Sequence, residues 1–146
     1  MKIKIFSTIL LLMLLVSCQQ GATDNPKSPY PSEKAIKNGD IVNVHGEITN
    51  VDRFNQFIKN VNQKVEDKVR ITSYTTEGDP IFYNLNFNGK EIEYTYDASQ
   101  DSYGGSDKQS TTCSVIVSST NENGVEYHLS KCSSNVGETF YFQIPK

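Results

Sequence analysis

The chain has 146 residues, of which 36% are hydrophobic and 21% are charged, and its formal net charge is −3. This length suits one compact domain around one hydrophobic core. The acidic balance argues against nucleic acid as a partner, because nucleic-acid-binding proteins cluster lysine and arginine against the phosphates.

The first seventeen residues have the layout of a secretory signal peptide, with two early lysines and an apolar run from Ile5 to Val16. The run has about a dozen residues, whereas a membrane-spanning helix needs about 20. The letters LVSC, which end at Cys18, resemble the bacterial lipobox, in which the cysteine is acylated and becomes N-terminal after cleavage. We therefore expect Cys18 to carry acyl chains that anchor the protein to the outer face of the cell membrane.

Residues 18–38 are predicted to form the lipidated cysteine and a flexible tether. The segment from Gln19 to Lys37 is polar, carries three prolines and shows neither helical nor strand periodicity. Loss of the two early lysines leaves twelve basic and seventeen acidic residues, a net charge of about −5. Residues 39–146 are then expected to fold as a single extracytoplasmic α+β domain.

The domain is predicted to begin with a strand at Ile41–His45 and to continue with a helix at Val51–Val65. Asn50 is a suitable N-cap for that helix. Apolar residues recur at three- and four-residue spacing along it, which is typical of one buried face: Val51, Phe54, Phe57, Ile58, Val61 and Val65. A third element, the alternating segment Lys68–Thr75, completes a strand-helix-strand order that is compatible with a crossover connection.

A hairpin is predicted around Asn88-Gly89, the strongest two-residue turn signal in the chain. Its expected register pairs Leu85 with Ile92, Tyr83 with Tyr94 and Ile81 with Tyr96. This places apolar and aromatic side chains on one face, which the helix is expected to cover. Further strands are predicted at Thr112–Ser118, Val125–Cys132 and Thr139–Ile144. The fold class is therefore α+β, with one amphipathic helix on an antiparallel-dominated sheet of about six or seven strands.

Cys113 and Cys132 are expected to form a disulfide, because an oxidising compartment favours pairing of the two remaining cysteines. A hairpin loop at residues 121–124 would place them directly opposite each other on neighbouring strands. Their Cα atoms should then lie about 5.5 to 6 Å apart.

The polar loop between Asp97 and Lys108 is the candidate contact surface. Its long, glycine-bearing sequence combines acidic side chains with one aromatic, and the candidate binding residues are Asp97, Asp101, Tyr103, Gly104, Gly105 and Asp107. A calcium site is an alternative for this loop, but an EF-hand needs glycine at position six and glutamate at position twelve, where this chain has Ser102 and Lys108. No metal or cofactor is assigned, and a plain linker between two hairpins stays an equal alternative.

No catalytic residue is assigned, because the chain has no G-x-S-x-G motif and both histidines, His45 and His128, lack a partner at ligand spacing. Carboxylate pairs are brought together by a fold and not by a motif, so two classes of function stay open. The first is a membrane-anchored binding or inhibitory module with an unknown surface or envelope ligand. The second is a cell-envelope hydrolase that uses carboxylates dispersed in the sequence.

Three segments of the chain are similar to a family of small Gram-positive lipoproteins that is known only as a domain of unknown function: GDIVNVHGEI (39–48), YTTEGDPIFYNLNFNGKEIEYTYDASQ (74–100) and GGSDK (104–108). The resemblance extends over about Gly39 to Cys132 and is most specific in the EGDPIFY and YTYD blocks. It implies an extracytoplasmic location and no activity.

Overall fold

The computed structural model describes residues 30–105 and 107–146. The predicted signal peptide, Cys18 and most of the predicted tether lie outside the described residues. The described residues form two α-helices, one 3₁₀ helix and eight strands: α1 Ser32–Lys37, β1 Ile41–Val44, β2 Glu47–Thr49, α2 Val51–Asn62, β3 Asp67–Tyr74, β4 Pro80–Phe87, β5 Ile92–Asp97, β6 Lys108–Asn121, β7 Gly124–Cys132, η1 Asn135–Thr139 and β8 Tyr141–Pro145.

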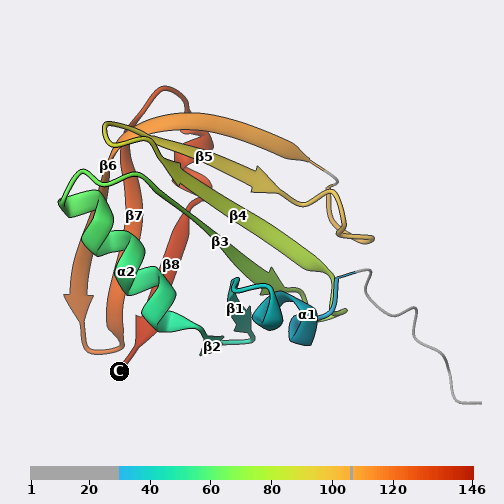
Figure 1. Ribbon diagram of the computed structural model, residues 1–146. Helices are drawn as coiled ribbons and strands as arrows, with labels where there is room; N and C mark the ends of the chain where they lie inside the picture. The colour runs from blue at the N-terminus through green and yellow to red at the C-terminus, as the bar shows by residue number, and fades with distance from the viewer. Residues whose placement is uncertain (1–29, 106) are drawn as a thin grey trace, which may run out of the picture.

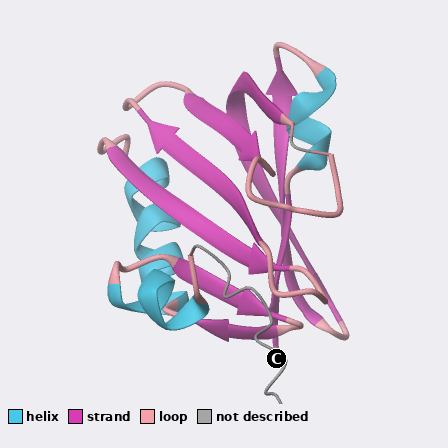
Figure 2. Cartoon of the chain, turned by 90° about the vertical axis from the view of Figure 1, so that its right-hand side faces the viewer, coloured by secondary structure: helices cyan, strands magenta, loops and turns pink. Residues whose placement is uncertain are grey.

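The strands form a single curved sheet in the order β2-β1-β3-β4-β5-β6-β7-β8, which bends into a nearly closed barrel (Figures 1 and 2). The expectation of six or seven antiparallel-dominated strands is therefore wrong in number and too simple in direction. The sheet is mixed, because β1 and β3 run parallel while the other neighbours are antiparallel. This parallel pair, with α2 between its strands in the chain, confirms the predicted crossover.

Strand β2 was missed because the turn before it gives little sequence signal. His45 and Gly46 have φ angles of 52° and 99°, so both residues adopt a left-handed backbone conformation. Together they form a two-residue turn that reverses the direction of the chain. Val44 then pairs with Glu47. Asparagine, aspartate or glycine usually fills the first of these positions, and histidine does so less often.

Helix α2 begins at Val51 as predicted but ends at Asn62, three residues before the predicted end. Lys64 has a φ of 58°, and the Val65 amide donates to the Asn60 carbonyl at 2.9 Å, so the chain leaves the helix through a left-handed turn. Asn50 is not a side-chain cap. The side-chain amide of Asn50 instead donates to the backbone carbonyls of Asp40 and Ile36, at 2.8 and 3.2 Å.

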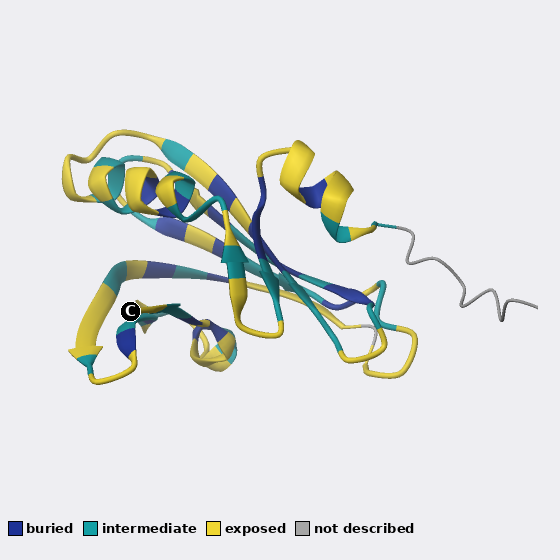
Figure 3. Ribbon diagram, turned by 90° about the horizontal axis from the view of Figure 1, so that it is seen from below, coloured by how far each residue is buried: buried dark blue, intermediate teal, exposed yellow. Residues whose placement is uncertain are grey.

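The core lies inside the barrel, and α2 packs over one part of it. Phe54 and Phe57 are fully buried, and the inner face of the helix is correspondingly buried in Figure 3. The Phe54 ring lies 4.9 Å from Tyr127 on β7 and 4.6 Å from Phe142 on β8, centroid to centroid. Leu85, Ile92 and Tyr94 of the central hairpin belong to the same core cluster, which confirms the predicted packing of helix and hairpin.

The β4-β5 hairpin has a register that differs by two residues from the predicted one. Leu85 pairs with Tyr94 and Tyr83 with Tyr96, because the loop is four residues long and not two. The Asn88 side-chain oxygen accepts from the amides of Lys90 and Glu91, at 3.0 and 2.9 Å, and so shapes the longer turn. A displacement of two residues keeps every side chain on its face, so the predicted inward set survives the error.

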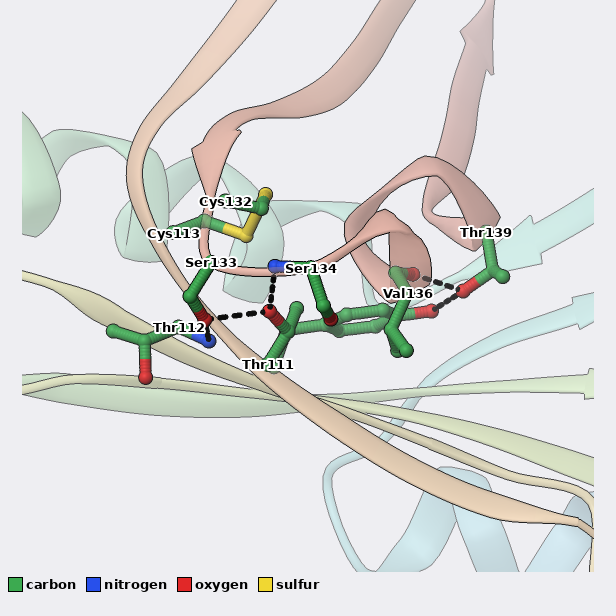
Figure 4. Close-up of a disulfide and its surroundings, with 9 residues drawn as sticks. Thr111, Thr112, Cys113, Cys132, Ser133, Ser134, Val136 and Thr139 are labelled. Carbon is green, nitrogen blue, oxygen red and sulfur yellow. Dashed lines mark hydrogen bonds between the residues drawn. A yellow bond between two sulfur atoms is a disulfide. The ribbon is translucent and has the colours of Figure 1, made fainter.

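The β6-β7 register is confirmed, with Cys113 opposite Cys132, and these cysteines form a disulfide (Figure 4). Their Cα atoms are 3.9 Å apart, closer than predicted. Strand β6 begins earlier than predicted because it pairs with β5 as far as Lys108. At the other end of the chain, Thr139 belongs to η1 and not to the last strand.

The domain begins earlier than predicted, since residues assigned to the tether fold onto the sheet. The Tyr30 hydroxyl donates to Asp40 at 2.9 Å, and the Tyr74 hydroxyl donates to the Tyr30 carbonyl at 2.7 Å. Helix α1 has one buried side chain, Ala35, and six residues are too few to show a helical period. None of the helices within residues 30–146 that the structure describes is long and apolar enough to cross a membrane.

Candidate functional site

The base of the candidate loop is a closed ladder between β5 and β6. Asp97 and Lys108 are register partners, and their carboxylate and ammonium groups lie 3.2 Å apart. The Ala98 amide continues the ladder by donating to the Asp107 carbonyl at 2.9 Å. Burial raises the pKa of Asp97, but hydrogen bonds from Ser99 and the Lys108 charge outweigh it, so the pKa lies below its usual value. The base therefore carries an ionised, paired carboxylate.

The tip of the loop is shaped by Asp101. Its carboxylate accepts from the amides of Tyr103 and Gly104 at 3.0 and 2.8 Å, while its own amide donates to the Ala98 carbonyl. A side chain on Gly104 would place its Cβ 2.2 Å from an Asp101 oxygen, so any other residue here would have to displace the Asp101 carboxylate. Gly105 has more space, since a Cβ there would meet its nearest atom at 3.5 Å. Asp101 thus also builds the loop, a role that the sequence did not predict for it.

A second loop holds the tip in place. The Asp79 carboxylate, buried at the end of the β3-β4 loop, accepts from the Ser102 amide at 2.8 Å. The Asp79 amide in turn donates to the Thr75 hydroxyl at 3.1 Å. The sequence gives no indication of this contact, because Asp79 and Ser102 are 23 positions apart. The EGDP block and the candidate loop are therefore one structural unit.

Tyr103 is the most exposed large side chain of the unit, with 79% of its surface accessible. Its ring has no aromatic or cationic contact within the described residues, so its shape and hydroxyl are available to a partner. Asp107 is also exposed, whereas Ser106 lies outside the described residues. Burial raises the pKa of the nearby Tyr96, and the charges of Asp101 and Asp107 raise it further. The loop is therefore an acidic surface around one projecting aromatic ring.

The carboxylates of the loop do not converge on a metal position. The Asp97 carboxylate is occupied by Ser99 and Lys108, and the Asp101 carboxylate accepts two backbone amides. No group of three or more histidine, cysteine, aspartate or glutamate side chains suitable for a metal ion occurs in the described part of the chain. The calcium alternative thus finds no ligand set in this arrangement.

The hydrolase alternative needs two carboxylates in one cleft, and four hollows of the described surface can be compared with this requirement. The first hollow lies between the barrel edges and the second lies beside α2. The third lies beside η1, and the fourth lies on the outer face of β3 to β6. Each is lined by at most one carboxylate: none in the first, Asp52 in the second, Glu138 in the third and Asp97 in the fourth.

The comparisons with known proteins yield one family. The model of the family described as Domain of unknown function (DUF4362) matches residues 38–128, which run from the end of α1 into β7. No curated protein and no solved structure gives a match to this chain. The predicted resemblance to a domain-of-unknown-function family is confirmed, and the matched residues include both the EGDP block and the candidate loop. The chain belongs to the DUF4362 family.

Proposed function

We propose that the protein is a lipid-anchored binding module at the outer face of the cell membrane and that the Asp97–Lys108 loop is its contact surface. The observation that carries this proposal is the exposed Tyr103 ring on a loop whose base and tip are both held by hydrogen bonds. A loop that is already ordered loses little conformational entropy on binding. Tyrosine adds a large amphipathic contact area at small entropic cost.

The loop's charge supports a partner of particular chemistry. Asp101 and Asp107 lie on the same loop as the exposed Tyr103 ring, and their charges raise the pKa of the neighbouring Tyr96. The cation at the base, Lys108, is already paired with Asp97. An acidic surface of this kind favours a partner that presents cationic groups or hydrogen-bond donors. Binding through it should weaken as salt concentration rises, because exposed charges are screened.

The predicted anchor at Cys18 supports a partner near the membrane. Tyr30 follows Cys18 by twelve positions, and a chain of that length spans at most about 40 Å. The Tyr30 ring packs on Phe82, with centroids 5.4 Å apart, and Phe82 is the register partner of Asp97. The described part of the chain therefore begins beside the base of the candidate loop (Figure 1). An anchor at Cys18 would keep this loop within reach of other components at the membrane surface.

Anchoring and contact are tested separately in cells that export the full chain. Cys18→Ser should move the protein from the membrane fraction to the medium without changing its thermal stability. A photo-crosslinking phenylalanine analogue at position 103 should give a discrete covalent adduct on intact cells, and Tyr103→Ala should prevent binding of the same partner.

The matched control for the contact experiment is position 117. Val117 is 43% exposed on β6, outside the loop, so the analogue at this position should give no adduct and Val117→Ala should bind normally. Retained binding by the Tyr103→Ala protein would rule out the loop as the contact surface. Retention of the Cys18→Ser protein in the membrane would rule out the lipid anchor.

A further inference from the structure

The barrel is open along one line, between the sheet edges formed by β2 and β8, and a cavity of about 210 Å³ lies in this opening. Asn43 and Ile48 line it from the β1-β2 hairpin, while Ser73 and Tyr83 line it from β3 and β4. The opposite wall is the segment from Phe140 to Gln143, which includes the first three residues of β8, together with Pro145 at the end of that strand. Residues from both ends of the sheet thus meet at one site.

The cavity is lined without any charged side chain, but several of its side chains carry polar groups with no partner among the described residues. The Ser73 and Tyr83 hydroxyls make no hydrogen bond within the described residues, and neither oxygen is sealed from solvent. Asn43 accepts from the Gly46 amide at 2.9 Å, which leaves its amide group as a donor. A pocket that combines an apolar lining with a few convergent polar groups is the usual form of a binding site. This lining, without a charged group to pair with, favours an uncharged occupant.

The wall formed by β8 adds backbone hydrogen-bonding groups to the cavity. Strand β8 pairs with β7 on one side only, since the sheet order of the described strands ends there. In an antiparallel pair, alternate residues direct their N–H and C=O groups away from the neighbouring strand. Such an edge is a template for one more strand.

We propose that an extended peptide of a partner protein adds to β8 at this opening and inserts an uncharged side chain into the cavity. The main chain of the peptide would pair with β8, and the Ser73 and Tyr83 hydroxyls would select the inserted side chain. The volume suits a single side chain of the size of leucine or tyrosine. Consecutive backbone positions along the wall favour a peptide over a sugar, which has no repeating backbone to match them. This site is separate from the Asp97–Lys108 loop and does not depend on its function.

The probe is a phage-displayed library of random decapeptides, selected on the purified full-length chain, from which the enriched peptide is synthesised. Enriched sequences should alternate, with uncharged β-branched, leucine or aromatic residues at every second position. Ser73→Leu fills the cavity from β3 and should weaken binding of the synthetic peptide by about tenfold or more. Ser119→Leu makes the same change at an exposed position of β6 and should leave affinity within about twofold.

Thermal unfolding of each variant checks that the fold is retained. If Ser73→Leu fails to fold, Tyr83→Phe removes a cavity hydroxyl and keeps the ring, and it should weaken binding by about threefold. The distinguishing readout is hydrogen exchange, because only a paired strand should slow the outward amides of Tyr141–Gln143 when the peptide is added.

Several results would overturn the proposal. The first is that the selected peptides show no alternating pattern of uncharged residues. The second is that the synthetic peptide binds the wild-type protein and Ser73→Leu with equal affinity. The third is that the peptide binds without slowing amide hydrogen exchange in β8. Binding of a neutral sugar in place of the peptides would assign the cavity to carbohydrate. Self-association that Ser73→Leu abolishes would make a second copy of the chain the occupant.

Discussion

Arg53 on α2 and Asp67 at the start of β3 form a two-point ion pair, in which the guanidinium donates to both carboxylate oxygens at 3.0 and 2.5 Å. The Asn60 side chain adds a third hydrogen bond to this carboxylate at 2.8 Å. The pair joins the first turn of the helix to the strand that follows it. It therefore fixes the path of the chain from α2 into the sheet.

Replacing Asp67 should change stability in a pH-dependent way. Burial raises the pKa of Asp67, but hydrogen bonds from Arg53 and Asn60 outweigh it, so the folded-state pKa lies below the ordinary value of 3.8. The stabilisation is then present above about pH 4 and is lost as pH falls through the folded-state pKa. Asp67→Asn should cost about 1 kcal/mol at pH 7, because Arg53 is about one-third exposed, and less at pH 3. Urea unfolding at both pH values measures this difference.

The control for Asp67 is Glu66→Gln, which removes an exposed neighbouring charge outside the ion pair and should change stability by less than about 0.5 kcal/mol. An equal loss for Asp67→Asn at pH 7 and pH 3 would show that the carboxylate charge is not the source of the effect.

A substitution at Gly137 should destabilise the segment that covers the disulfide. A Cβ at this position would lie 2.2 Å from the Cys132 sulfur and 3.2 Å from the Cys113 sulfur. Gly137→Ala must therefore displace η1 from β6 and β7, at a cost of about 1–3 kcal/mol. Gly105→Ala is the control, because its Cβ would have an ordinary contact at 3.5 Å. Thermal melts that show equal effects for both variants would contradict the proposed close packing.

Two apolar residues of the same predicted helical stripe should respond differently to truncation. Phe54 is fully buried between β7 and β8 aromatics, so Phe54→Ala should cost about 3–5 kcal/mol. Val65 follows the helix end and is 49% exposed, so Val65→Ala should cost less than about 0.5 kcal/mol. Chemical denaturation of the two variants compares these costs directly. A large loss at Val65 would place the end of the helix in the core after all.

Tyr74 should limit stability at alkaline pH. Burial raises its pKa first, and the charges of Tyr30, Asp40 and Glu33 raise it further, to about 12. A raised folded-state pKa gives stabilisation that is complete below the unfolded value of 10 and is lost as pH rises towards 12. Tyr74→Phe should lose about 1 kcal/mol at pH 7, with its hydrogen bond to the Tyr30 carbonyl, and should show a flatter decline above pH 10. Urea unfolding of the wild type and this variant across the alkaline range measures the decline. An equal loss of stability above pH 10 in both proteins would contradict the role of Tyr74.

The sequence alone was sufficient for features that depend on residue spacing within one element or one hairpin. The stripe of Phe54 and Phe57 predicted the buried face of α2 because helical neighbours recur every three or four residues. The pairing of Cys113 with Cys132 followed from counting outwards from one turn. The β4-β5 register was wrong by two residues, yet its inward face was right, since strand faces depend only on parity.

Tertiary structure decided everything that joins distant parts of the chain. The contact between Asp79 and Ser102 connects two loops that carry no signal of each other in the sequence. Tyr30 and α1 belong to the domain only because the sheet offers Phe82 and Tyr74 to pack and bond with them. The cavity between β2 and β8 exists because the curvature of the whole sheet brings its two ends close together without pairing them. Curvature accumulates over all eight strands, so no local pattern of residues encodes it.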